Sequence, residues 1–150
     1  MIEMQRTVYT NAPVSAVYAY LADFGNAEDW DPNAIAVTRL SGNGGVGTEY
    51  RVESLFAGRS TLLDYRVTDL DPNKLIRLRG EKKAITAVDT ITIVEGAARV
   101  AVTYAVAFEF NGVFAMVEPV LKIAVRRLLE QGAQGLSREL LRLERTVGRP

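Results

Sequence analysis

The sequence contains no cysteine and no histidine among its 150 residues. Without cysteine the chain has no disulfide, no thiolate nucleophile and no thiolate ligand for a metal. Without histidine it lacks the commonest general base, the commonest metal ligand and the Ser-His and Cys-His catalytic pairs. Glu28, Asp29 and Asp31 flank Trp30 in a turn-rich segment, but alone they would make a weak oxygen site. We therefore predict no metal and no cofactor.

Neither sign of charge prevails, because 18 Lys and Arg balance 18 Asp and Glu. A chain without a long-range positive field is a poor binder of nucleic acid, so we predict no such partner. No run of about 18 apolar residues could span a bilayer, and the N-terminus lacks the apolar core of a signal peptide. We expect a cytoplasmic protein with no transmembrane segment. Transient contact with a membrane surface and the oligomeric state stay open.

What the sequence has is a large apolar fraction, 48% of its residues, and clear periodicity. A chain of this length buries enough surface for one core, so we expect residues 1–150 to form a single domain. Alternating apolar and polar residues with short turn signals between them predict consecutive antiparallel strands. The strands are expected at 2–10, 35–40, 47–56, 60–70, 74–82, 84–95 and 98–110.

Two helical segments interrupt or follow these strands. Pro13 and the spacing of Val14, Val17, Tyr18 and Leu21 predict a short helix, with a second helical turn near 26–30. A long helix is predicted over 119–146, with one apolar stripe made of Leu121, Val125, Leu128, Gly132, Leu136, Leu140 and Leu143. The two glycines within it, at 132 and 135, favour close approach of helix and sheet over a bend that makes room for a ligand. The fold class is α+β.

Several local motifs carry a family resemblance over nearly the whole chain. They are Asn11-Ala12-Pro13, Asp23 followed by Trp30-Asp31-Pro32, Gly45-Val46-Gly47-Thr48, and the amphipathic C-terminal helix. In this order they make the chain resemble the START-like or helix-grip superfamily, which includes the polyketide cyclase/dehydrase and lipid-transport proteins. The resemblance implies a curved seven-stranded sheet in the order 1-7-6-5-4-3-2, wrapped around the long helix, with a cavity between them. That superfamily hosts carriers, receptors, cyclases and regulators, so it does not fix the substrate.

Strand parity predicts which side chains face this cavity, because successive residues of a strand point to opposite faces. Three phenols, Tyr50, Tyr65 and Tyr104, share the apolar faces of their strands and are expected inside. Ligand-binding residues are predicted to be Trp30 at one end together with Tyr50, Phe56, Leu63, Tyr65, Leu78, Ile91, Tyr104, Phe108, Leu121, Val125 and Leu128. Such a lining is mostly apolar with few polar groups, as in pockets for hydrophobic ligands.

Two charged residues, Asp89 and Arg6, lie on otherwise apolar strand faces. An unpaired charge facing an apolar interior costs several kcal/mol, so each residue lies at the pocket rim, pairs with the other or with a ligand, or follows a bulge. If Asp89 points inward without a partner, its pKa should rise, which would make it the best general acid or base of the chain. The candidate catalytic residues are Asp89, Arg6, Tyr65 and Tyr104.

The first functional hypothesis is a non-catalytic carrier or sequestering protein for a small hydrophobic molecule such as a lipid, an isoprenoid or a polyketide. The alternative is a polyketide cyclase/dehydrase-type enzyme that uses the same pocket, because a carboxylate, tyrosines and an arginine suffice for enolisation. A regulator that binds another protein is a third hypothesis. A space filled by side chains, with no cavity larger than a few waters, would count against the first two.

Overall fold

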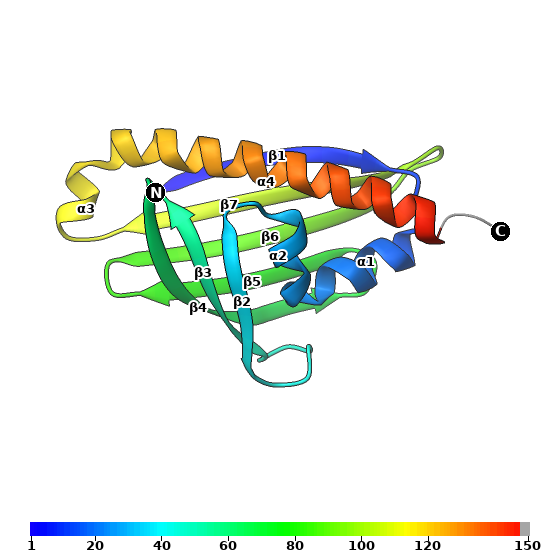
Figure 1. Cartoon of the computed structure of the whole chain (residues 1–150), viewed down its shortest axis with the longest axis horizontal. Coiled ribbons are helices and arrows are strands. Elements are labelled where there is room, and N and C mark those ends of the chain that lie inside the picture. The colour runs from blue at the N-terminus through cyan, green and yellow to red at the C-terminus, as the bar shows by residue number, and fades with distance from the viewer. Residues whose placement is uncertain (148–150) are drawn as a thin grey trace.

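A seven-stranded antiparallel sheet frames the protein, whose computed structural model describes residues 1–147 (Figure 1). The strands are β1 (Ile2–Thr10), β2 (Ala34–Ser41), β3 (Glu49–Phe56), β4 (Arg59–Asp71), β5 (Leu75–Lys82), β6 (Ile85–Glu95) and β7 (Val100–Phe110). Their spatial order is β1-β7-β6-β5-β4-β3-β2. Consecutive strands from β2 to β7 are therefore neighbours, and the predicted meander and its strand order are confirmed.

The helices lie between β1 and β2 and after β7. They are α1 (Val14–Ala22), the 3-10 turn η1 (Phe24–Asn26), α2 (Ala27–Trp30), α3 (Val113–Met116) and α4 (Glu118–Val147). In Figure 1 α4 runs along the curved sheet beside β1, with α3 at one end and α1 toward the other. The predicted helix-grip architecture is confirmed, and the predicted helix over 119–146 differs from α4 by one residue at each end.

Strand alternation fixes the buried face of the sheet. In β7 the side chains at Val102, Tyr104 and Val106 are buried, whereas those between them keep partial exposure. The register of β6 with β5 and with β7 runs without a shift past Asp89, so no bulge turns this residue outward. The parity assumed from the sequence therefore holds at Asp89, which is 6% exposed.

The buried stripe of α4 differs from the predicted one at Leu128, and Leu143 at its far end is only partly buried. Leu129 is fully buried, and Leu128 is only partly buried at the edge of the stripe. Neighbouring residues of a helix project about 100° apart, so two adjacent leucines cannot both point at the sheet. Both are apolar, and for that reason the sequence pattern did not separate them.

The two glycines of α4 make close contacts with different partners. A Cβ built on Gly132 would lie 3.3 Å from Cε2 of Tyr104 on the sheet, as expected for close approach of helix and sheet. A Cβ built on Gly135 would lie 1.9 Å from the carbonyl oxygen of Trp30, so this glycine accommodates the end of α2 rather than the sheet. Gly135 thereby fixes where the chain leaves α2 and enters the segment that contains Asp31.

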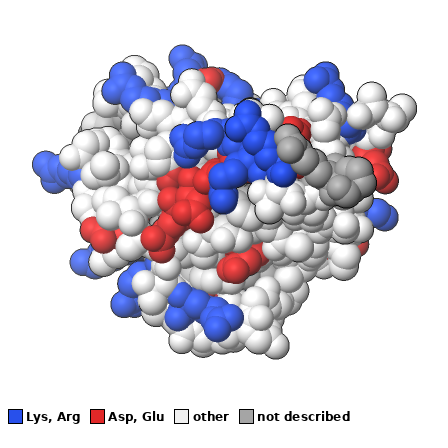
Figure 2. Space-filling view, turned by 45° about the vertical axis from the view of Figure 1, so that its right-hand side comes forward, with Lys and Arg blue, Asp and Glu red and all other residues white. Residues whose placement is uncertain are grey.

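Charges are mixed on the surface. On the face drawn in Figure 2, basic and acidic side chains lie next to one another, and on α4 Arg142 Nε donates to Glu139 at 2.7 Å. Over residues 1–147 no helix is at once long and apolar enough to cross a bilayer.

Candidate ligand-binding pocket

A pocket lies on the inner face of the sheet, lined by residues of β2, β3, β4, β6 and β7 and covered by residues of η1, α2, α4 and the segment after α2. We call it the inner pocket. Its lining is mostly apolar and consists of Phe24, Ala27, Asp31, Ala34, Val52, Ser54, Phe56, Thr61, Leu63, Tyr65, Ile85, Asp89, Tyr104, Phe108 and Leu128.

Half of the residues predicted from the sequence line this pocket. They are Phe56, Leu63, Tyr65, Tyr104, Phe108 and Leu128, together with Asp89 from the catalytic candidates. The others form the core around it: Trp30, Tyr50, Leu78, Ile91 and Val125 are at most 2% exposed, and Leu121 lies farther along α4. The inward orientation expected for the three tyrosines is confirmed, since all are buried. Their role in binding stays a prediction.

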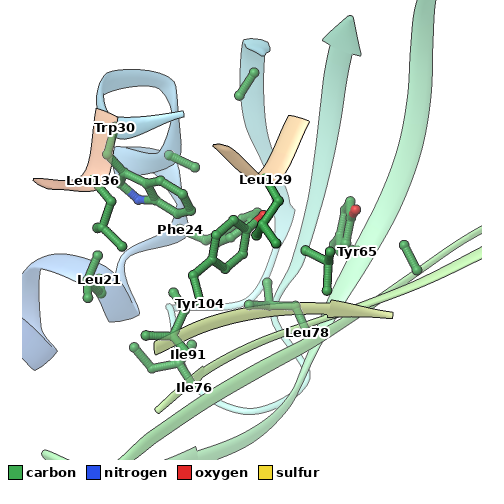
Figure 3. Close-up of a cluster of buried hydrophobic side chains, with 14 of the residues drawn as sticks. Leu21, Phe24, Trp30, Tyr65, Ile76, Leu78, Ile91, Tyr104, Leu129 and Leu136 are labelled. Carbon is green, nitrogen blue, oxygen red and sulfur yellow. The ribbon is translucent and has the colours of Figure 1, made fainter. Parts of the chain in front are cut away.

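Aromatic contacts hold the polar centre of the pocket in place. The ring of Tyr104 meets that of Trp30 edge to face at 5.2 Å between centroids, and Phe24 lies 5.9 Å from Tyr65. Figure 3 shows Tyr104 between the indole of Trp30 and the ring of Tyr65. Edge-to-face pairs of this kind are favourable and restrict the rings, so the Tyr104 hydroxyl is aimed by its neighbours.

Asp89 is the polar residue at the floor of the pocket. Its Oδ2 accepts a hydrogen bond of 3.3 Å from the hydroxyl of Tyr104, while its Oδ1 is buried without a hydrogen-bond partner in the described part of the chain. Burial, reinforced by the negative charge of Asp31, raises the pKa of Asp89 to about 7, and the Tyr104 hydrogen bond opposes this rise only in part. A carboxyl group with this pKa exchanges its proton near neutral pH.

Asp31, which follows α2 directly, is a second carboxyl group of the inner pocket. The residue as a whole is partly exposed, yet its carboxyl group is desolvated, which raises its pKa to about 6. A hydrogen bond of 3.0 Å, which Oδ1 accepts from the backbone N–H of Asn33, opposes this rise. Sequence reasoning considered Asp31 as a weak metal ligand and as part of the Trp30-Asp31-Pro32 motif, and did not place it in the pocket. The signal available was Trp30, an aromatic residue in a polar segment, which indicated that the segment docks on the core.

Arg6, the remaining catalytic candidate, lies outside the pocket. Its guanidinium forms an ion pair with Glu130 of α4, with the Nε donating to Oε1 at 2.5 Å. Both side chains keep more than a third of their surface exposed. Arg6 thus joins β1 to α4 and does not pair with Asp89.

The inner pocket is narrow, but it adjoins a larger space. Its cavity volume is about 50 Å³, where one water needs roughly 10–15 Å³, although all its atom-free space including the open mouth is about 610 Å³. A second space of about 430 Å³, the outer hollow, shares the lining residues Phe56, Thr61 and Ile85 with it. Taken alone, the inner pocket is no larger than a few waters, which counts against a carrier or an enzyme that uses this pocket only. A hydrophobic ligand must therefore extend past Phe56 into the outer hollow or displace side chains.

The outer hollow differs from the inner pocket because cations lie around its aromatic wall. Its wall includes Phe56, Phe110, Phe114 and Leu121, and the cations Arg59, Lys82 and Lys83 lie around it. Phe56, Phe108 and Phe110 stack at 5.8 to 6.2 Å and form the aromatic wall between the two spaces.

Solved structures share this fold at low sequence identity. A protein from Thermus thermophilus superposes with a TM-score of 0.78 and 14% identity over 92% of this chain and 96% of that one. A START superfamily protein from Mycobacterium smegmatis gives 0.75 and 18% over 92% and 96%. The Zhui aromatase/cyclase from a Streptomyces species gives 0.74 and 19% over 92% of each chain. At such identities the likeness concerns the fold alone.

No curated protein sequence matches the chain. The sequence profile of one family does, over residues 1–141, which is nearly the whole length. Taken with the seven-stranded sheet closed over α4, this match shows that the chain belongs to the polyketide cyclase/dehydrase and lipid transport family.

Proposed function

We propose that the protein binds a small hydrophobic molecule across the inner pocket and the outer hollow and acts as its carrier or sequestering protein. The observation that carries this proposal is the composition of the two adjoining spaces, which are lined mainly by apolar and aromatic side chains. Buried apolar surface of this kind favours an apolar ligand over water.

Displacement of an environment-sensitive fluorescent lipid analogue tests this function. Thr61 lines both spaces, so Thr61→Phe should block their junction and weaken binding of the analogue by about tenfold or more. Leu62→Phe adds an aromatic ring to the outer face of the same strand, where the residue is 42% exposed, and should leave binding unchanged. If the analogue fails to bind the wild-type protein, and native mass spectrometry of the purified protein shows no retained ligand, the proposal is wrong.

A carrier must also exchange its ligand, and one end of the molecule is suited to contact a membrane. Around α3 and the start of α4 several large apolar side chains are exposed, namely Val113, Phe114, Met116, Val117, Val120 and Ile123. The cations Lys82 and Lys83 line the outer hollow together with Phe114. Apolar residues flanked by cations favour a bilayer that contains anionic lipids.

Flotation with vesicles tests this contact. We expect binding to vesicles of phosphatidylglycerol and phosphatidylcholine and weaker binding to phosphatidylcholine alone. Met116→Glu should abolish it, because it places a negative charge among the exposed apolar residues. Leu141→Glu, on α4 but outside this group, is the control. Equal binding of the two variants would contradict the membrane contact.

A second function, acid-base catalysis of the cyclase or dehydrase type, is favoured by the Asp89–Tyr104 hydrogen bond at the pocket floor. As a carboxylate, Asp31, which has the lower pKa of the two, could take a proton from a carbon next to a carbonyl, the C–H electron pair passing into the enolate, whose oxygen would then receive the proton of the Asp89 carboxylic acid. Asp89→Asn keeps the shape and removes the proton donor, so turnover of a substrate should fall about 10²–10⁴-fold while binding survives. Unchanged turnover would exclude this role.

A further inference from the structure

The polar lining of the inner pocket contains carboxyl and hydroxyl groups but, among the described residues, no cation. Besides Asp31 and Asp89 it consists of the hydroxyl residues Ser54, Thr61, Tyr65 and Tyr104, and no Lys or Arg belongs to the lining that the structure describes. The cations Arg59, Lys82 and Lys83 all belong to the outer hollow, and Arg6 is engaged by Glu130. The two adjoining spaces therefore differ in charge, with acids inside and cations outside.

The buried carboxyl group of Asp89 has an acceptor atom without a hydrogen-bond donor in the described part of the chain. Asp89 receives one donor, the Tyr104 hydroxyl, and its buried Oδ1 receives none from residues 1–147. Leaving such a buried group unpaired is unfavourable, and more so when it is charged. The groups that act on Asp89 are Asp31 and Tyr104, and Tyr65 of β4 is also close enough to feel its charge. All three are acidic or neutral groups, so the protein supplies no counter-charge.

Gly132 of α4 lies next to Tyr104 and Asp31. The point where a Cβ would stand at Gly132 lies 3.3 Å from the Tyr104 ring and 3.9 Å from Oδ1 of Asp31, so a side chain longer than that of alanine would press on both groups. The volume of about 50 Å³ has room for a few waters and therefore for a small head group such as a primary ammonium group, and the outer hollow has room for an apolar body.

We propose that the inner pocket selects hydrophobic primary amines, with the ammonium group donating to Asp89 and Asp31 and the apolar body lying in the outer hollow. This inference rests on the proposed binding function. An ammonium group brings both the N–H donors and the positive charge that the site lacks. A ligand carboxylate in the same position would add a third acid and be repelled.

Calorimetric titration with three ligands of equal chain length tests this selectivity. At pH 8 dodecylamine should bind at least about tenfold more tightly than dodecanol, because a charge-assisted hydrogen bond is stronger than one from a neutral donor. Dodecanoate, which can bind only with its head toward the outer cations, should show no dependence on Asp89. At pH 6 amine binding should release protons from the two acids, seen as a difference between buffers of unlike ionisation heat.

The variants separate the outcomes. Asp89→Asn should reduce amine affinity to that of the alcohol, Asp31→Asn should reduce it partly, and the exposed Asp64→Asn should leave it unchanged. If the amine binds no better than the alcohol, or if Asp89→Asn keeps the preference, the selectivity is wrong although the binding function stands. If none of the three ligands binds, the binding function fails with it.

Discussion

Asp89 on β6 and Tyr104 on β7 are diagonal neighbours on the inner face of the sheet. The register pairs Asp89 with Val106 and Ile91 with Tyr104, so the two side chains are offset by two residues and lie on the same face. Their hydrogen bond of 3.3 Å is therefore a consequence of strand register. The same register places the carboxyl group where it is fully covered, which makes its ionisation costly.

The stability of the protein should consequently fall as pH rises. Because the pKa of Asp89 rises from 3.8 to about 7 on folding, the native state holds a proton between about pH 4 and 7 that the unfolded state has released. The free energy of unfolding should decrease through this window, by on the order of 4 kcal/mol for full ionisation of Asp89. Asp31, with its pKa near 6, adds to the decrease.

Urea unfolding at pH 5 and pH 8 measures this effect. Asp89→Asn should flatten the pH dependence and make the protein more stable than wild type at pH 8. Asp64→Asn is the matched control, since Asp64 is exposed, pairs with Arg51 at 2.9 Å and has a pKa lowered by that pair. It should give no gain at pH 8. A wild-type pH dependence that persists in Asp89→Asn would contradict the assignment.

Tyr104→Phe should raise the pKa of Asp89 further. The Tyr104 hydroxyl donates to the ionised carboxylate and is the group that lowers this pKa against burial and Asp31. Tyr65→Phe also removes a hydroxyl from the pocket, but no hydrogen bond joins Tyr65 to Asp89 in the described structure, so a much smaller shift is expected. NMR titration of the Asp89 side-chain carboxyl in both variants distinguishes them, and equal shifts would show that the hydrogen bond is unimportant.

Much of this fold could be predicted because its signals are local. The alternation of apolar and polar residues in the strands, the turn residues and the spacing of apolar residues in α4 all depend on neighbours along the chain. Asp89 was identified as a candidate because its charge interrupts the apolar face of its strand. The position of Asp31 depends instead on how α2 docks against Gly135, a contact between segments about a hundred residues apart in sequence. No periodicity exists in that segment to indicate where its side chains point.

Arg6 shows a different limit of the same reasoning. Strand parity correctly indicated that the side chain of Arg6 leaves the sheet on the side of α4. Parity carries no information about the partner on the helix, so it could not predict the ion pair with Glu130. The same limit explains why Leu128 and not Leu129 was predicted to be buried. The rotation of α4 about its axis is set by tertiary contacts, which the sequence pattern does not contain.

The two glycines of α4 should respond differently to the same substitution. Gly135→Ala places a Cβ 1.9 Å from the Trp30 carbonyl oxygen, so α2 and α4 must separate, at a cost of roughly 1–3 kcal/mol. Gly132→Ala meets only a ring carbon at 3.3 Å and gains about 1 kcal/mol of helix propensity, so its stability should stay near wild type. Thermal unfolding of both variants tests the difference, and equal losses would mean that α2 is not held by Gly135.

Phe56 should control passage between the two spaces. It lines both of them and stacks on Phe108 at 5.8 Å and Phe110 at 6.2 Å, so Phe56→Ala removes one member of the aromatic wall and widens the junction. Stopped-flow mixing with the fluorescent lipid analogue should show faster association and faster dissociation, because the barrier lies at the junction rather than at the floor. Leu62→Ala shortens an exposed side chain on the outer face of β4 and should leave both rates unchanged. If Phe56→Ala changes neither rate, the ligand reaches the inner pocket by another route and the outer hollow is not part of the binding path.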